Sequence, residues 1–254
     1  MGVTFDVGGE AYGRFMGRYS EPLATVFADW TGVRRGERAL DVGCGPGALS
    51  RVLIDRLGLE RVVAADPSQP FVEAIRARFP ELEVHHAPAE QLPFGDEQFD
   101  QTLAQLVVSF MQDPVTGLAE MARVTRRGGV LAASVWDLAG DRSPLSHFWS
   151  AARRLDPSVA DESNRNGARE GHLAALATEA GLTDVESSEL RVTVAHPGFE
   201  EWWEPYTLGV GPAGDHYASL DAAGREALRE ECRRTLPDGP FEVTAVAWAV
   251  RAHA

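Results

Sequence analysis

Hydrophobic residues in the first half of the chain alternate between short apolar runs and helical spacing. The apolar runs predict strands at residues 38–42, 61–65, 82–86, 99–108 and 130–136. The helical spacing predicts helices at residues 10–30, 46–57, 68–79 and 114–125. Strands that alternate with helices in this way are typical of βαβ units, whose strands are parallel.

The pattern changes after Trp136. Helical spacing predicts helices at residues 145–155, 169–180, 199–206 and 222–236, and period-two alternation predicts strands at 183–195 and 241–250. We therefore expect an α/β, Rossmann-like, doubly wound sheet of seven strands. It should be mostly parallel with an antiparallel last strand, and it should carry a helical lid at the carboxyl edge of the strands, where ligands bind in such sheets.

A glycine-rich turn joins the first predicted strand to the next helix, in the stretch Leu-Asp-Val-Gly-Cys-Gly-Pro-Gly-Ala-Leu at 40–49. Gly43, Gly45 and Gly47 allow a sharp turn and a close approach of the backbone to a ligand. The helix that follows would direct its unpaired N–H groups at that ligand. The turn predicts a nucleotide-like cofactor.

Two kinds of cofactor fit this turn. Gly43, Gly45 and Ala48 match the dinucleotide pattern, with Asp66 near the position of a ribose-binding acid, which would favour an NAD(P)-dependent oxidoreductase. Asp41 argues against that reading, because a carboxylate at the end of a buried strand is costly without a positive partner. Pyrophosphate is negative, whereas S-adenosylmethionine carries an ammonium and a sulfonium group. A turn or helix-cap acceptor is the simpler alternative for Asp41 and for Asp66.

Charge and composition restrict the function further. The net charge is −14 and all 24 basic side chains are arginine. The missing lysine excludes Schiff-base chemistry and a P-loop, and the negative charge argues against a nucleic-acid partner. We expect no membrane span, no secretory signal and no metal site, and a cytoplasmic setting fits the two cysteines. The sequence does not indicate an oligomeric state.

Taken together, several motifs resemble class I S-adenosylmethionine-dependent methyltransferases, of the small-molecule type grouped with the ubiquinone and menaquinone methyltransferases. The resemblance covers about residues 10–136. It includes the glycine motif at 40–49, the strand ending at Asp66, Ala-Pro-Ala-Glu-Gln-Leu-Pro-Phe at 87–94, Phe-Asp at 99–100, and the stretch from Glu120 to Gly129.

The resemblance implies how the chain would hold S-adenosylmethionine. Asp41 would hold the methionine ammonium. The backbone at Gly43, Gly45 and Gly47 would run close to the methionine and ribose portions. Asp66 would accept hydrogen bonds from both ribose hydroxyls.

Further residues would complete the cofactor site. Pro67 would lie at the adenine edge, and Ala89 and Glu90 would frame the adenine. Gln105 and Leu106 would flank the methionine and the methyl group. Tyr12 and Arg18 would close over the cofactor. The family often has an acidic residue where this chain has Pro88, so an acidic adenine contact is not expected.

The predicted elements and the resemblance together divide the chain into three regions. Residues 1–37 would be an N-terminal helical cap over the cofactor, 38–140 the cofactor-binding α/β core, and 141–254 the rest of the sheet with a substrate lid inserted at about 141–168 and 197–237.

Activity would then be methyl transfer to an O, N or C atom of a small organic acceptor. Trp202, Trp203 and Tyr206 either line the acceptor pocket or anchor the lid, and His147 is the candidate base if one is needed. A non-methylating S-adenosylmethionine-binding protein, such as a cyclase or regulator, is the other alternative.

Overall fold

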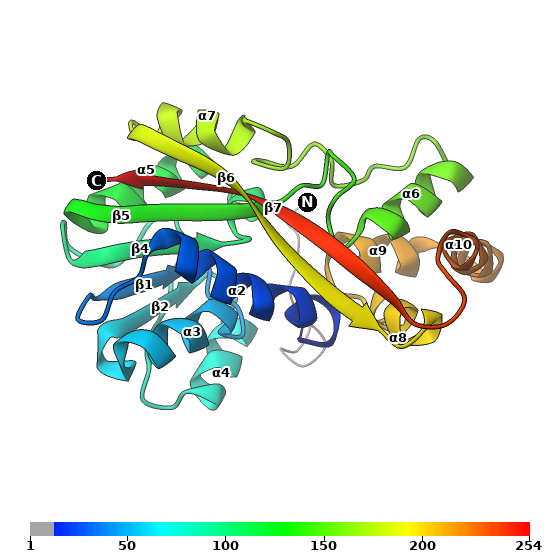
Figure 1. Ribbon diagram of the computed structural model, residues 1–254, viewed down its shortest axis with the longest axis horizontal. Helices are drawn as coiled ribbons and strands as arrows, with labels where there is room; N and C mark the ends of the chain where they lie inside the picture. The colour runs from blue at the N-terminus through cyan, green and yellow to red at the C-terminus, as the bar shows by residue number, and fades with distance from the viewer. Residues whose placement is uncertain (1–12) are drawn as a thin grey trace.

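A single seven-stranded sheet forms the centre of the computed structural model, which describes residues 13–254 (Figure 1). The strand order is β3-β2-β1-β4-β5-β7-β6. The strands are β1 Ala39–Val42, β2 Val62–Asp66, β3 Glu83–His86, β4 Phe99–Gln105, β5 Thr125–Trp136, β6 Thr183–His196 and β7 Phe241–His253.

Strand directions confirm the predicted fold class. β1 pairs in parallel with β2 and β4, β2 with β3, and β4 with β5. β7 is antiparallel to both of its neighbours, β5 and β6. The strand order reverses at β1, so the connections from β1 and β4 leave toward opposite faces and open a crevice at the carboxyl ends of these strands.

Helices cover both faces of the sheet. α2 Arg18–Thr31, which follows a short π-helical turn η1 at Gly13–Gly17, packs with α3 Ala48–Leu57 and α4 Gln69–Arg78 in one hydrophobic core. α5 Pro114–Val124 and α7 His172–Glu179 form the core on the other face. Successive strand residues point to opposite faces, so Ala39 belongs to the first core and Leu40 to the second.

The remaining helices gather at the end of the sheet where β5 stops, near the end of β6 and the start of β7 (Figure 1). They are α6 Ser146–Leu155, α8 Phe199–Trp203, the 3-10 helix η4 Glu204–Leu208, α9 Gly211–Ser219 and α10 Ala222–Thr235. We call this group the lid helices. α9 was not predicted, because Gly211, Pro212 and Gly214 are typical of a loop, although proline is well suited to the first turn of a helix.

Three predicted strand boundaries were wrong by three residues or more; one of them is the end of β7, which extends to His253 and not to residue 250. β5 begins at Thr125 and not at residue 130, because Gly128 and Gly129 form a bulge inside the strand and do not end it. The bulge lies opposite the shift in register between Phe99 and Gln101. β4 ends at Gln105 and not at residue 108, because Leu106 has a left-handed backbone with φ of 65°. Two further 3-10 turns, η2 at Leu59–Arg61 and η3 at Val108–Phe110, lie in loops.

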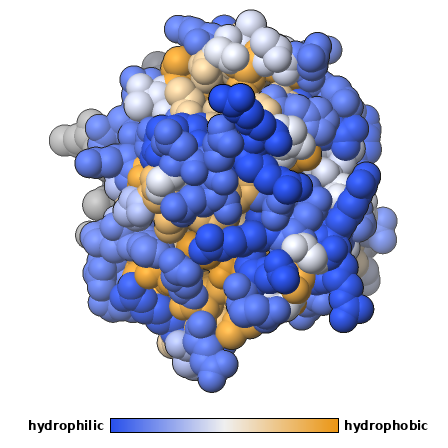
Figure 2. Space-filling model, turned by 90° about the vertical axis from the view of Figure 1, so that its left-hand side faces the viewer, coloured by the Kyte–Doolittle hydropathy of each residue, from blue (hydrophilic) through white to orange (hydrophobic). Residues whose placement is uncertain are grey.

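The end of the molecule opposite the lid helices is covered mainly by hydrophilic residues, with hydrophobic ones in narrow strips between them (Figure 2). Within residues 13–254, no helix is long and apolar enough to cross a membrane.

Candidate functional site

The glycine turn after β1 contains three left-handed residues: φ is 67° at Gly43, 52° at Gly45 and 89° at Gly47. A Cβ atom on Gly43 would lie 2.4 Å from a methyl group of Val107, and one on Gly47 would lie 3.1 Å from Ile75. A Cβ on Gly45 would meet no described atom within 4 Å. Packing therefore requires glycine at 43 and 47, whereas position 45 leaves the backbone open to a ligand.

Asp41 is buried beside this turn. Its side chain is 1% exposed, and its Oδ2 accepts a hydrogen bond of 2.5 Å from the Ser50 hydroxyl on α3. Burial raises the pKa of Asp41 to about 7; the Ser50 hydrogen bond opposes this rise and the nearby Asp66 charge adds to it. Among residues 13–254, no arginine or histidine forms an ion pair with Asp41. The site thus contains a buried carboxylate that a cationic ligand would stabilise.

Asp66 ends β2 and ties the glycine turn to α4. Its Oδ2 accepts from the Gly45 N–H at 2.8 Å, and its Oδ1 accepts from the Ser68 N–H at 2.8 Å. Burial raises the pKa of Asp66, while these two hydrogen bonds lower it. A carboxylate oxygen has two acceptor sites, so each oxygen can still accept a hydrogen bond from a ligand. The helix-start role and a ligand-binding role are therefore compatible here.

Gln105 closes the third side of this crevice at the end of β4. Its Nε2 donates to the Ser20 carbonyl on α2 at 2.9 Å, and its Oε1 is buried with no hydrogen-bond partner in the described chain. Leu106 then turns the chain, and its N–H donates to the Ser134 carbonyl of β5 at 2.8 Å. The free amide oxygen is an acceptor suited to an ammonium group, which has only donors.

The loop after β3 contributes the fourth side. Glu90 Oε1 accepts from the N–H groups of Gln112 and Asp113 at 2.9 and 3.3 Å, so it anchors the loop that follows η3. Ala89 is buried, and the Pro67 carbonyl accepts from His86 Nε2 at 2.8 Å. The structure thus brings the predicted residues at the ends of β1, β2, β3 and β4 to one edge of the sheet.

Arg18 has a partner outside this crevice. It forms an ion pair of 2.5 Å with Glu201 of the lid and lies 3.2 Å from Nδ1 of His196, which is buried and also bonded to the Tyr19 hydroxyl at 2.7 Å. These contacts join α2 to the lid helices. Tyr12, the other residue predicted to close over the cofactor, lies outside the described residues.

Replacing Arg18 by methionine distinguishes its predicted contact with the cofactor from its observed contact with the lid helices. Because Arg18 already pairs with Glu201, we expect a loss of about 1 kcal/mol in unfolding free energy and little change in cofactor affinity. Urea denaturation and calorimetric titration measure the two effects, with Arg51→Met, which removes a partly exposed ion pair with Asp55, as the control. A tenfold loss of affinity with unchanged stability would assign Arg18 to the cofactor instead.

The predicted acceptor residues lie in the interior of the lid. Trp202, Trp203 and Tyr206 are at most 4% exposed, and the Tyr206 ring stacks on Phe148 with centroids 4.7 Å apart. Trp202 and Tyr206 also border a small cavity beside Arg18. These rings pack against one another and against aromatic residues of η1, α6 and α9.

His147 lies at the edge of this aromatic interior, with its ring T-shaped to that of Trp202 and the two centroids 6.3 Å apart. It lines a polar hollow between α6 and the start of β7, and burial lowers its pKa. Within residues 13–254, no group of three His, Cys, Asp or Glu side chains is arranged to hold a metal ion.

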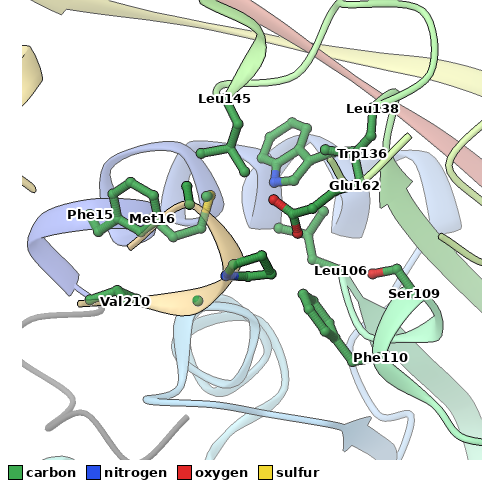
Figure 3. A pocket seen from close by; sticks show the side chains of 13 residues that line it. Phe15, Met16, Leu106, Ser109, Phe110, Trp136, Leu138, Leu145, Glu162 and Val210 are labelled. Atoms are coloured by element: carbon green, nitrogen blue, oxygen red, sulfur yellow. The ribbon is translucent and has the colours of Figure 1, made fainter. Parts of the chain in front are cut away.

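A different cavity lies next to the cofactor residues, between the sheet and the lid (Figure 3). We call it the β4–β5 cavity. Its apolar walls come from η1, the ends of β4 and β5, and the start of α9; they include Phe15, Met16, Leu106, Trp136, Leu145 and Pro212.

Two polar residues, Ser109 and Glu162, also line the β4–β5 cavity. The sequence analysis did not find these residues. Only Trp136, which lines the same cavity, had a position that could have indicated a ligand site, because it lies at the carboxyl end of a strand. Glu162 lies in a polar stretch between predicted helices, where nothing in the sequence indicates burial.

Comparison with known proteins finds a similar domain in the first half of the chain. Residues 40–133 match the family described as "Methyltransferase domain". A protein from a Streptomyces fradiae transposon is 36% identical over 165 residues, which cover 62% of this chain and 47% of that protein. An uncharacterized methyltransferase of Mycobacterium tuberculosis is 34% identical over 142 residues, covering 56% of this chain and 55% of its own. The chain thus spans about half the length of these curated relatives.

Solved structures share the fold. A Thermotoga maritima S-adenosylmethionine-dependent methyltransferase superposes with a TM-score of 0.53 at 18% identity, covering 96% of this chain and 98% of that one. Phosphoethanolamine N-methyltransferase 2 of Haemonchus contortus, solved with S-adenosylhomocysteine, gives 0.60 at 15% identity and covers 96% of this chain and 56% of that one. Residues 40–133 therefore resemble a methyltransferase domain, and the chain has the same fold as these solved methyltransferases.

Proposed function

We propose that this protein transfers a methyl group from S-adenosylmethionine to an O, N or C atom of a small organic acceptor. The observation that carries the proposal is Asp41, which is 1% exposed and has no cationic partner in residues 13–254. A bound amino-acid ammonium would supply that partner, and a pyrophosphate would not.

The residues at the crevice fit this cofactor. Asp41 and the free Gln105 Oε1 would hold the ammonium, and the open backbone at Gly45 would allow a close approach. Asp66 would use its remaining acceptor sites for the ribose hydroxyls, because its donor-free carboxylate can receive two hydrogen bonds at once. Pro67, Ala89 and Glu90 follow β2 and β3, at the side where the adenine would lie.

Chemically, the sulfonium supplies a methyl group with a good leaving group already attached. The contribution of this chain is then to align an acceptor atom with the methyl carbon and the sulfur and to exclude water. Leu106 connects the two parts of the site, since it follows Gln105 directly and lines the β4–β5 cavity. Fold alone does not define the acceptor.

Calorimetric titration tests the cofactor assignment. We expect saturable binding of S-adenosylmethionine and of S-adenosylhomocysteine, and no binding of NADH or NADPH at the same concentrations. Saturable NADPH binding without a response to S-adenosylmethionine would overturn the proposal in favour of an oxidoreductase.

Labelled methyl transfer tests the activity. Incubation with methyl-labelled S-adenosylmethionine and cell extract should give labelled small molecules in mass spectrometry. A [4+2]-cyclase also shares this fold, with a TM-score of 0.55 at 18% identity. Cofactor binding without any labelled product would therefore favour a non-methylating protein.

Asp66→Ala is expected to weaken S-adenosylmethionine binding by about 1–3 kcal/mol, because charge-assisted hydrogen bonds to the ribose are lost. The variant also frees the Gly45 and Ser68 N–H groups. Titration should be paired with thermal unfolding, and exposed Asp55→Ala on α3 is the matched control. An unchanged dissociation constant would contradict the assigned ribose contact.

A further inference from the structure

The β4–β5 cavity has an apolar wall with polar groups at one side. Figure 3 shows the indole nitrogen of Trp136 and the carboxylate of Glu162 directed into the same space, beside Met16 and Leu145. Leu106 forms part of the wall and directly follows Gln105 of the cofactor crevice, so a molecule in this cavity lies next to the cofactor site. The inference below rests on the proposed methyl transfer and names its acceptor class.

Trp136 has an unsatisfied donor. Its side chain is 6% exposed, and the Nε1 atom is buried with no hydrogen-bond partner in the described chain. A buried N–H without an acceptor is costly, and such groups are rare unless a ligand or water satisfies them. The cavity therefore offers a hydrogen-bond donor to whatever occupies it.

Glu162 is a buried acid at the same cavity. It is 4% exposed; its Oε2 accepts from Trp149 Nε1 at 3.0 Å, and Arg165 Nε lies 3.1 Å from its Oε1. Burial raises the pKa of Glu162, which Arg165 and the Trp149 hydrogen bond partly offset. Each carboxylate oxygen has a second acceptor site. Glu162 can thus accept a hydrogen bond from a ligand and, because it is a stronger base than an exposed glutamate, a proton as well.

The lining also restricts ligand charge. No arginine or histidine is among the described residues that line the cavity, and Arg165 is paired with Glu162 and lies over the Phe110 ring at 4.8 Å. Because Arg165 is already paired with Glu162, an anionic ligand would find no cation among the described lining residues. A hydroxyl group meets both requirements, because it accepts from one partner while it donates to another.

We propose that the β4–β5 cavity binds a neutral, largely apolar hydroxyl compound, whose oxygen accepts from Trp136 Nε1 and donates to Glu162, and that Glu162 takes the hydroxyl proton as the oxygen is methylated. One oxygen lone pair forms the new O–C bond as the C–S bond breaks, and the electron pair of that bond stays on sulfur as a neutral thioether. The hydroxyl proton moves to the Glu162 carboxylate, which becomes a neutral acid and later releases the proton to solvent. One positive and one negative charge disappear together, which a buried apolar site favours.

Binding of two matched probes tests the acceptor class in the full chain with S-adenosylhomocysteine present. The probes are 2-naphthol, neutral at pH 7, and 2-naphthoate, an anion of similar shape, titrated by calorimetry. We expect the wild type to prefer 2-naphthol by at least tenfold. Glu162→Gln should reduce this preference at least fivefold, and Trp136→Phe should weaken 2-naphthol binding about fivefold to tenfold. Exposed Glu170→Gln is the control and should change neither value.

Methyl transfer to 2-naphthol tests the proton step. Glu162→Gln should lower kcat by about 10²–10⁴-fold, as is typical for a missing general base, with unchanged S-adenosylmethionine affinity. Equal affinity for both probes in the wild type, no 2-naphthol binding, or an unchanged preference in Glu162→Gln would overturn the inference. The wild-type comparison decides the case if Glu162→Gln fails to fold. Failure of the proposed function is distinguishable, because it appears as a loss of S-adenosylmethionine binding in the wild type.

Discussion

Asp41→Asn is expected to remove most S-adenosylmethionine affinity and, at the same time, to stabilise the ligand-free protein at pH 8. The two effects have the same cause. A buried carboxylate without a cation destabilises the fold and provides the binding energy when the cationic ligand arrives. The loss of one partner of a buried charge pair typically costs about 2–5 kcal/mol of binding, which corresponds to a decrease in affinity of about 30-fold or more.

The stability effect has a defined pH window. Burial raises the folded-state pKa of Asp41 to about 7 from an ordinary value of 3.8. Between about pH 4 and pH 7 the folded protein therefore binds more protons at Asp41 than the unfolded chain does, and stability falls as pH rises. Above pH 7 the penalty is complete. The asparagine variant lacks this titration, so it should exceed the wild type by roughly 1–3 kcal/mol at pH 8 and by little at pH 4.

Urea denaturation at pH 4, 6 and 8, combined with titration of S-adenosylmethionine, measures both effects. The wild-type affinity should itself increase with pH up to about 7 and then become constant, because the cation binds the ionised carboxylate. Asp55→Asn, an exposed site on α3, is the control. Tight cofactor binding by Asp41→Asn, or a lower stability than the wild type at pH 8, would contradict the role assigned to Asp41.

Gly43→Ala is expected to destabilise the protein severely, by roughly 2–5 kcal/mol. A Cβ atom there would lie 2.4 Å from Val107, and the backbone φ of 67° disfavours any L side chain. The expected value combines about 1–2 kcal/mol for the left-handed backbone with about 1–3 kcal/mol for overpacking. Urea denaturation provides the measurement.

Gly45→Ala is the matched comparison. Its backbone is also left-handed, with φ of 52°, but its Cβ would meet no described atom within 4 Å. We therefore expect a stability loss limited to about 1–2 kcal/mol together with cofactor binding at least tenfold weaker, since the methyl group would occupy the space left for the ligand. A larger stability loss in Gly45→Ala than in Gly43→Ala would show that packing is not the reason for glycine at position 43.

The sequence by itself determined the core of this domain. Apolar runs and helical spacing depend on local geometry, so the strands up to β4, the helices between them and the glycine turn follow from residues close together in the chain. The placement of Asp41 and Asp66 at one edge also follows, because parallel strands end at the same side of a sheet. Their roles toward a cofactor stay predictions that the variants above test.

Only the tertiary structure decided what the lid residues contact. The sequence left open whether Trp202, Trp203 and Tyr206 line an acceptor pocket or anchor the lid, because a local pattern does not say which surfaces cover them. In the structure, aromatic residues of η1, α6 and α9 pack against them. Arg18 is separated by more than 180 residues from its partner Glu201, so no local pattern could predict this ion pair. Glu162 lies in a polar loop, and nothing in the neighbouring sequence indicates that it is buried. The left-handed turn at Leu106 and the cavity between β4, β5 and α9 likewise arise from packing between distant segments, which a one-dimensional pattern does not encode.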